Sequence, residues 1–168
     1  MPKLERPALM HYIDASFEGV GSPKWFLIGK DIEEMSVELN PDTETVKNIL
    51  GETSVKDNGY EPSMSADPYY ANPDDSIYAK LKDIAMNRLK GGSCRTKILE
   101  VIVEDTSATT HSAWMEDVVV KPQSYGGDTS GFAIPFDVTF DGNRKAGTVT
   151  ITSGTPTFTE GTGDVTGV

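Results

Sequence analysis

The sequence has very few of the residues that build disulfides and metal sites. Among 168 residues there is one cysteine, Cys94, and there are two histidines, His11 and His111. A lone cysteine cannot form an internal disulfide, and these three residues lie too far apart in the sequence for a zinc-binding spacing. We therefore expect Cys94 to be a small buried hydrophobic residue, and we expect no metal and no cofactor.

Long hydrophobic runs are also missing. No run approaches the ~20 consecutive apolar residues that a membrane-spanning helix needs. The first residues, MPKLERPALMHY, lack the basic start and apolar centre of a secretory signal. We therefore expect a protein that folds in the cytoplasm and has no membrane partner.

Basic residues are scarce relative to acidic ones. Lys and Arg number 15 against 26 Asp and Glu, which gives a net charge of −11. A conventional nucleic-acid-binding protein needs a basic surface to neutralise phosphates, and this composition argues against one. An acidic surface instead repels polyanions. Residues 31–67 hold most of the excess, with ten acidic residues and two lysines.

Residues 33–39 alternate between polar and apolar types, which predicts a strand with one acidic and one apolar face. Residues 40–42, Asn-Pro-Asp, predict a turn, and residues 43–50 predict a second strand that completes a hairpin. Asp57-Asn58-Gly59 is a further strong turn signal. The two faces of the first strand consist of Met35, Val37 and Leu39 on one side and Glu34, Ser36 and Glu38 on the other.

One amphipathic helix is predicted at about 73–90. Asn72 can cap it, Pro73 suits its first position, and Gly91-Gly92 follows its end. Such a helix is expected to pack its apolar side on a sheet. That side consists of Ile77, Tyr78, Leu81, Ile84, Ala85 and Leu89.

The remaining segments indicate a mostly β domain. Residues 95–105 and 112–123 predict strands, and residues 131–152 predict a hairpin around Asp141-Gly142-Asn143. We expect a single domain at 23–152, preceded by an arm with little regular structure at 1–22 and followed by a Gly/Thr-rich tail at 153–168. The order of elements predicts an α+β, mostly β fold, a β-sandwich or split barrel with one flanking α-helix.

No convincing catalytic set is present in the sequence. The stretch GGDTSG, residues 126–131, is similar to the Gly-Asp-Ser-Gly of trypsin-like proteases, but Thr129 interrupts the motif. A Ser/His/Asp triad would have to use His11 or His111, and no glycine-rich phosphate loop leads from a strand into a helix. We expect no catalytic residues and no enzyme, which leaves assembly as the favoured role.

Three spaced motifs give this sequence a resemblance to a known family over roughly residues 10–152. It resembles the major tail tube proteins of long-tailed, siphovirus-type bacteriophages, especially those of phages and prophages from Gram-positive hosts. The motifs are W-x-x-x-G-x-D at Trp25, Gly29 and Asp31, N-x-x-x-E-x-x-x-x-I-x-G at Asn40, Glu44, Ile49 and Gly51, and G-x-x-x-P-F-x-V-x-x-x-G at Gly131, Pro135, Phe136, Val138 and Gly142.

This resemblance implies a structural protein of the virion, assembled in the host cytoplasm. In that family the fold is similar to the tube protein of type VI secretion systems, six copies close into a ring, and stacked rings form a tube. The expected partners are further copies of the chain, the tape measure, tail terminator and tail tip proteins, and double-stranded DNA that passes through the lumen without specific binding.

The resemblance also suggests roles for particular residues. Glu34 and Glu38, together with Glu44, are expected to face the lumen and repel DNA, the alternative being that they face bulk solvent. The tail from Ser153 is also expected to contact a neighbouring subunit of the ring. The expected contacts between subunits or rings are Tyr12 and Phe17 in the arm, and Tyr60, Met64, Tyr69 and Tyr70 in the loop 55–70.

Two alternatives stay open at this point. One is the tube protein of a contractile tail, a tailocin or a secretion system, in which no DNA passes. The other, of a different class, is a monomeric β-domain that acts as a binding or decoration protein.

Overall fold

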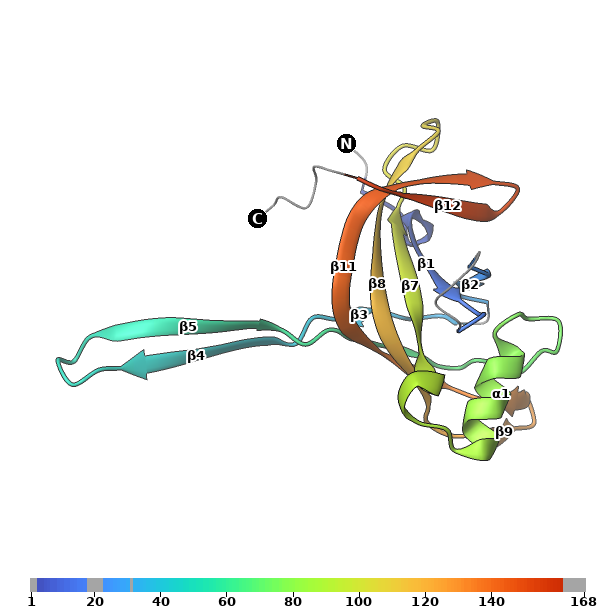
Figure 1. Cartoon of the computed structure of the whole chain (residues 1–168), viewed down its shortest axis with the longest axis horizontal. Helices are drawn as coiled ribbons and strands as arrows, with labels where there is room; N and C mark the ends of the chain where they lie inside the picture. Colours follow the sequence, from blue (N-terminus) through green and yellow to red (C-terminus); the bar gives the residue numbers. More distant parts are fainter. Residues whose placement is uncertain (1–2, 18–22, 31, 162–168) are drawn as a thin grey trace.

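The computed structural model describes residues 3–17, 23–30 and 32–161 (Figure 1). Its main sheet has eight strands, all antiparallel, in the order β2-β1-β7-β8-β11-β6-β3, with β12 paired to β11. The sheet curls into a half-barrel with one α-helix beside it, so the predicted α+β, mostly β fold is confirmed. The sheet strands are β1 (Leu9–Asp14), β2 (Trp25–Ile28), β3 (Val37–Glu38), β6 (Ser63–Ala66), β7 (Arg95–Ile102), β8 (His111–Pro122), β11 (Phe136–Thr152) and β12 (Thr155–Glu160). The other elements are η1 (Arg6–Ala8), β4 (Pro41–Lys47), β5 (Thr53–Tyr60), α1 (Tyr78–Asn87), η2 (Gly91–Cys94), β9 (Gly126–Asp128) and β10 (Gly131–Ala133).

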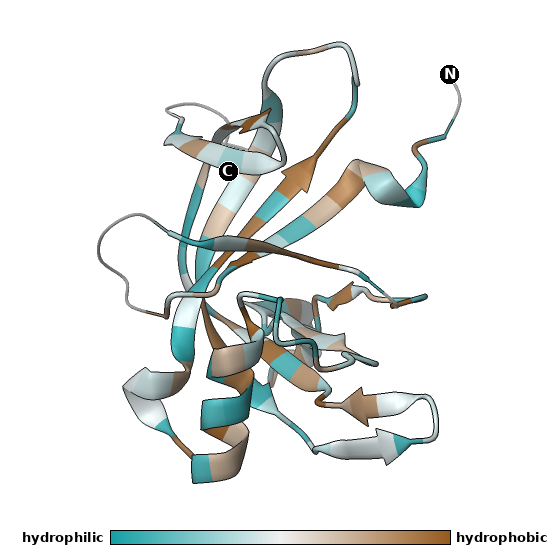
Figure 2. Ribbon diagram, turned by 90° about the vertical axis from the view of Figure 1, so that its right-hand side faces the viewer, coloured by the Kyte–Doolittle hydropathy of each residue, from teal (hydrophilic) through white to brown (hydrophobic). Residues whose placement is uncertain are grey.

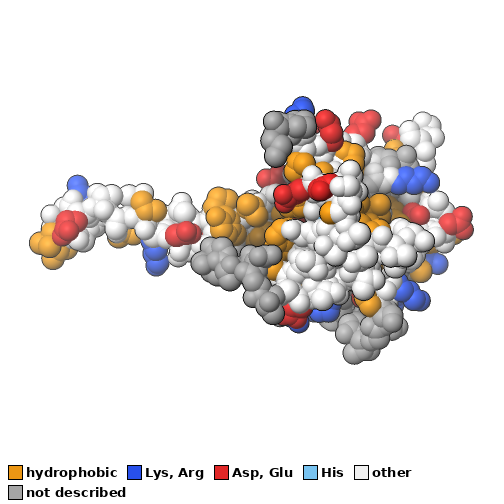
Figure 3. Space-filling model, turned by 90° about the horizontal axis from the view of Figure 1, so that it is seen from above, with side chains coloured by type: hydrophobic (Ala, Val, Ile, Leu, Met, Phe, Trp, Pro, Cys, Tyr) orange, Lys and Arg blue, Asp and Glu red, His pale blue; other side chains and the backbone are white. Residues whose placement is uncertain are grey.

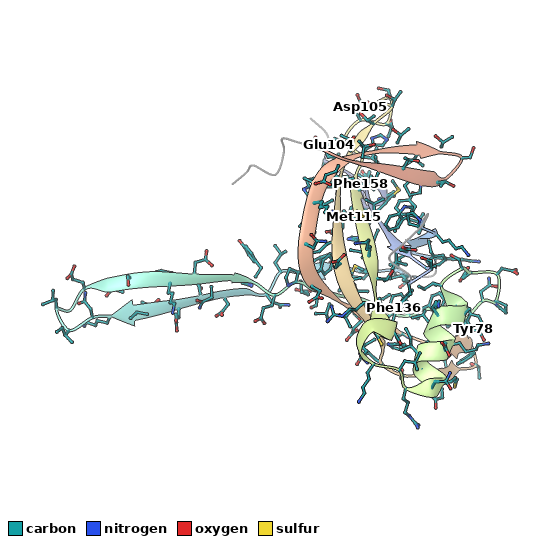
Figure 4. The ribbon with its side chains drawn as sticks, viewed as in Figure 1. Tyr78, Glu104, Asp105, Met115, Phe136 and Phe158 are labelled. Atoms are coloured by element: carbon teal, nitrogen blue, oxygen red, sulfur yellow. The ribbon has the colours of Figure 1, made fainter. Side chains whose placement is uncertain are left out.

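Two apolar cores lie on opposite faces of this sheet. Ile98 and Leu99 are neighbours on β7, both are fully buried, and each belongs to a different core. Figure 4 labels Phe136 in the larger core near α1, and Met115 and Phe158 beside the smaller one near β12. Figure 2 shows hydrophobic segments along the strands, and these strands supply side chains to both cores. Because both faces are covered, several strands carry apolar residues without alternation.

The first strand, β1, corrects the prediction of an unstructured arm over residues 1–22. Leu9–Asp14 pairs with β2 on one side and β7 on the other. Tyr12 and Ile13 are buried on opposite faces, in the smaller and the larger core. This two-sided burial removes the alternation by which strands are found in a sequence. Residues 1–2 and 18–22 of the predicted arm lie outside the described residues.

The prediction of a helix is confirmed, although the helix is shorter than 73–90. Ile77, Leu81 and Ile84 are buried, as the apolar stripe predicted, and Ile77 and Leu81 belong to the larger core. Asn72 caps a turn instead of the helix, because its Oδ1 accepts the Asp74 N–H at 3.0 Å. Cys94 is fully buried, as predicted.

The longest strand, β11, corrects the prediction of a hairpin around residues 141–143. Its pairing with β8 slips at Phe140/Gly142 and again at Gly142/Lys145, so the triplet forms bulges within one 17-residue strand. Gly142 and Asn143 have φ angles of 98° and 56°, which a bulge needs as much as a turn does. The hairpin turn lies instead at Ser153-Gly154, where both φ angles are positive, and it leads into β12. That strand occupies part of the predicted tail, and residues 162–168 lie outside the described residues.

The predicted hairpin of residues 33–50 is also wrong. Within the predicted strand 33–39, only Val37–Glu38 is a strand, and it pairs with β6. The hairpin consists of β4 and β5, with its turn at residues 48–52, where Asn48 Oδ1 accepts the N–H groups of Leu50 and Glu52. The Asp57-Asn58-Gly59 signal marks a bulge inside β5, between the pairs Pro41–Tyr60 and Thr43–Asp57.

Candidate assembly surfaces

A long hairpin projects from the sheet, and we call residues 41–60 the projecting arm. It consists of β4, β5 and the turn between them, and it points away from the rest of the molecule (Figure 1). Every residue of the arm except Gly59 is exposed. The eight residues of β5 correspond to roughly 27 Å of extended chain at about 3.4 Å per residue. The arm therefore carries its tip well beyond the body of the chain.

The tip of the projecting arm is apolar. Ile49 is completely exposed and Leu50 is 77% exposed, and Val46 and Val55 are exposed along the strands. Figure 3 shows hydrophobic side chains at the far end of the arm. An isolated two-stranded hairpin is at best marginally stable in water, and the exposed Glu44–Lys56 pair at 3.7 Å adds little to it. Exposed apolar side chains on such an element are typical of a contact surface.

An acidic groove lies at the root of the arm, with a volume of about 630 Å³. Glu34 and Glu38, which the sequence placed on one acidic face, both line it. Glu33 and Asp67 line it as well, so four carboxylates share this groove. Asp67 was not expected here, because it comes from the chain after β6, far along the sequence. Glu44 lies apart from the groove, on the arm.

An apolar pocket of about 440 Å³ lies beside η1, β1 and β2. Arg6 closes one side of it, because its guanidinium donates to the carbonyls of Leu9 at 2.8 Å and Met35 at 3.1 Å. Arg6, Lys30 and Glu33 are its exposed charged residues. Its apolar lining consists of Pro7, Leu9, Met10, Leu27, Ile28, Ile32 and Met35.

The six residues predicted to contact other subunits lie in different environments. Tyr12, Met64 and Tyr69 are only 3%, 2% and 5% exposed, because they fill the two cores of their own chain. Burial leaves them little area for a neighbour, so the structure does not support contact at these three. Tyr60, at 62% exposure on the projecting arm, is accessible. Phe17 and Tyr70 are half-buried.

The contacts of Tyr69 show why this residue is internal. Its ring meets Phe136 edge-on with 5.9 Å between centroids, and its hydroxyl donates to Asp75 Oδ2 at 3.0 Å. Burial and the nearby Asp75 carboxylate both raise the pKa of the Tyr69 hydroxyl. These contacts join the chain after β6 to the turn before α1.

A network of three buried polar side chains, His11, Glu100 and Glu116, and the partly exposed Arg144 lies where β11 bends. Arg144 Nη1 donates to Glu100 at 2.6 Å and to Glu116 at 2.9 Å, and Glu116 Oε2 accepts the Gly142 N–H at 3.0 Å. His11 Nε2 lies 3.0 Å from the second oxygen of Glu100. Burial alone would raise the pKa of Glu100, but the His11 hydrogen bond and the Arg144 charge outweigh burial and lower that pKa. The network therefore favours the charged form of Glu100, and the Glu116–Gly142 contact fixes the bulge.

The histidines and the protease-like stretch form no recognisable reactive site. His11 on β1 belongs to this network, and His111 begins β8, two strands away in the sheet. The stretch 126–131 forms the exposed β9–β10 hairpin. Among the described residues, no group of three or more His, Cys, Asp or Glu side chains could hold a metal ion, and no helix is long and apolar enough to cross a membrane.

The chain matches no known family description, and no curated protein is detectably similar to it in sequence. Its fold is similar to that of a chain in a solved structure, the cryo-EM structure of an extracellular contractile injection system, the PVC sheath/tube terminator in its extended state. The TM-score is 0.51, and the match covers 88% of this chain and 97% of that chain at 11% sequence identity. At this identity the likeness establishes a shared fold.

Proposed function

We propose that this protein is a self-assembling structural component of a tail-like tube. The observation that carries the proposal is the projecting arm, an exposed hairpin with an apolar tip and no core of its own in the chain. Ile49 and Leu50 would be stabilised by burial in another molecule. The likeness in fold to a chain of a contractile injection system supports a tube-related role.

The arm also favours a closed or stacked arrangement of identical copies. A contact in which one copy's arm meets a different surface of the next copy is heterologous, and such contacts generate rings or filaments. We propose hexameric rings that stack into the tube of a phage tail, together with tape measure, tail terminator and tail tip proteins. In this arrangement the protein is located in the virion after assembly in the host cytoplasm.

The acidic groove is the surface that we assign to the lumen. Glu34 and Glu38 stand there with Glu33 and Asp67, and four clustered carboxylates would repel the phosphates of passing double-stranded DNA. Glu44 stands on the projecting arm and contacts Lys56, so we leave it out of this assignment.

The likeness in fold to a chain of a sheath/tube terminator favours a second candidate, a terminator component of a contractile injection system. A terminator would form a single ring that stops growth, whereas a tube protein would form rings that stack. Electron microscopy of the assembled protein separates these two candidates, because it shows directly whether ring stacking continues.

The test of the proposed function is negative-stain electron microscopy of purified protein, fresh and after concentration and ageing. We expect six-fold rings with a central hole, and hollow tubes in the aged sample. Single rings that never stack would favour the terminator. A particle that forms neither, even with tail tip or terminator proteins added as nuclei, would overturn the proposal in favour of a binding or decoration protein.

A further inference from the structure

The tip of the projecting arm and the apolar pocket beside β2 have complementary features. The tip presents two neighbouring aliphatic side chains, Ile49 and Leu50, at 101% and 77% exposure. The pocket is open and largely apolar, and Leu27 at its side is 47% exposed. A cavity of roughly 150 Å³ already admits a benzene molecule. The pocket's volume of about 440 Å³ therefore leaves room for both tip side chains.

The charges around the two surfaces are complementary as well. Lys47 ends β4 and Glu52 immediately precedes β5, so the two flank the tip, and both are exposed. The pocket exposes Arg6 and Lys30 together with Glu33. Each charge at the tip therefore has an opposite charge available at the pocket. Exposed pairs of this kind contribute more to orientation than to affinity.

The tip of an arm cannot fill the pocket of its own chain. The arm extends away from the main sheet, and η1, β1 and β2 belong to the body from which it points away (Figure 1). The pocket lies among those body elements. Each copy nevertheless carries one tip and one pocket. The pocket of a second copy can therefore receive the tip of the first.

We propose that Ile49 and Leu50 of one copy insert into the pocket lined by Leu9, Leu27 and Met35 of the next copy. This inference rests on the proposed self-assembly and names the two surfaces that would carry it. The contact is heterologous, so each copy both inserts a tip and receives one. Every subunit in a ring or stack would then be joined to two neighbours by the same contact.

The proposal can be tested by trapping the contact with a disulfide between two variants. Leu50→Cys places a thiol on the tip, and Leu27→Cys places one beside the pocket. The native Cys94 is fully buried and does not compete. The two variants carry tags of different size, are mixed under assembly conditions and oxidised mildly, and the mixed dimer is measured on a non-reducing gel. Val55→Cys, exposed on the shaft of the arm, replaces Leu50→Cys in the control mixture.

We expect the Leu50→Cys mixture to give at least fivefold more mixed dimer than the control mixture. Equal yields in both mixtures, under conditions where the unmodified protein forms rings, would overturn the inference and leave the proposed function standing. Enriched mixed dimer without rings would support the contact and count against the tube. As a second measurement, Ile49→Asp should abolish ring formation, and rings of normal appearance from this variant would also overturn the inference.

Discussion

Arg144→Met removes the positive charge from the buried network while keeping much of the aliphatic length of the side chain. Arg144 contacts Glu100 and Glu116, whose side chains are only 12% and 8% exposed. Without the guanidinium, two carboxylates remain close together in a largely dry environment, next to the bulge at Gly142. We expect the folded state to be destabilised because neither carboxylate gains a new partner.

The size of this effect depends on the burial of the two glutamates and on the partial exposure of Arg144. Removing one partner of a buried ion pair costs about 3–5 kcal/mol. Arg144 itself is 41% exposed, so water screens part of the interaction. We therefore expect the free energy of unfolding to fall by about 2–3 kcal/mol. At about 2–4 °C per kcal/mol for a chain of this size, Tm should fall by roughly 4–12 °C.

The assay is urea denaturation at a protein concentration that keeps the chain monomeric. The matched control is Lys145→Met, which removes the same charge from the next residue, where the contact with Glu160 spans 3.9 Å and both side chains are exposed. We expect the control to change the free energy of unfolding by less than about 0.5 kcal/mol. Equal losses in the two variants would refute the idea that the buried network stabilises the bulge.

The same network predicts a dependence on pH. The pKa of Glu100 is lowered from its ordinary value of 4.5 in the folded chain, so its contribution to stability is fully present above that value. The contribution is lost as the pH falls through the lower, folded pKa. The difference in stability between the native protein and Arg144→Met should therefore shrink from pH 7 towards pH 3. A difference that stays constant over that range would contradict this assignment.

Three further predictions concern the core, the β11–β12 hairpin and the acidic groove. Leu81→Ala should cost about 2–5 kcal/mol in urea denaturation, because the fully buried side chain would leave a cavity between α1 and the sheet. Gly147→Ala should lower Tm and speed proteolysis at β12, because its new Cβ would collide with the backbone carbonyl of Thr159, and an unchanged Tm would contradict that. Glu34→Lys with Glu38→Lys should leave assembly intact and slow or stall DNA ejection from virions, and ejection at the normal rate would remove the lumen assignment.

The fold could be predicted from the sequence where the signal is local. The helix was found because Ile77, Leu81 and Ile84 recur with helical spacing, and this spacing depends on no distant partner. The strands β7 and β8 were found for a similar reason, as dense runs of β-forming residues. By contrast, β1 was missed because its two covered faces leave no alternation in the sequence.

Both internal turn predictions failed in the same physical way. Asp57-Asn58-Gly59 and Asp141-Gly142-Asn143 supply residues that accept positive φ, and Gly59 and Gly142 adopt 93° and 98°. Turns and bulges both need this conformation. Whether such a triplet forms a turn or a bulge depends on the partner strand. Here β4 continues past the first triplet and β8 past the second, so both triplets form bulges. That information is not contained in the triplet itself.

The candidate surfaces were predictable in part. Alternation placed Glu34 and Glu38 on one side, and both do line the acidic groove. Asp67 joins them only because β6 pairs with β3, which is a tertiary fact. The projecting arm was missed because apolar residues such as Ile49 and Leu50 predict burial within the chain. Sequence alone does not distinguish burial within one chain from burial between two.

The energetics of the proposed contact limit how the protein could assemble. Burying one large aliphatic side chain contributes about 1.5–3 kcal/mol, so Ile49 and Leu50 together offer about 3–6 kcal/mol. Bringing two molecules together costs about 4–15 kcal/mol in lost translational and rotational freedom. One inserted tip alone therefore offsets at most the lower end of the cost of pairing, and isolated pairs should be weak. In a closed ring every copy both gives and receives a tip, so the last copy to join forms two contacts for one loss of freedom. Assembly through the projecting arm should therefore begin only above a threshold concentration or on a nucleus, and the mild oxidation experiment captures the contact even where it is too weak to persist unaided.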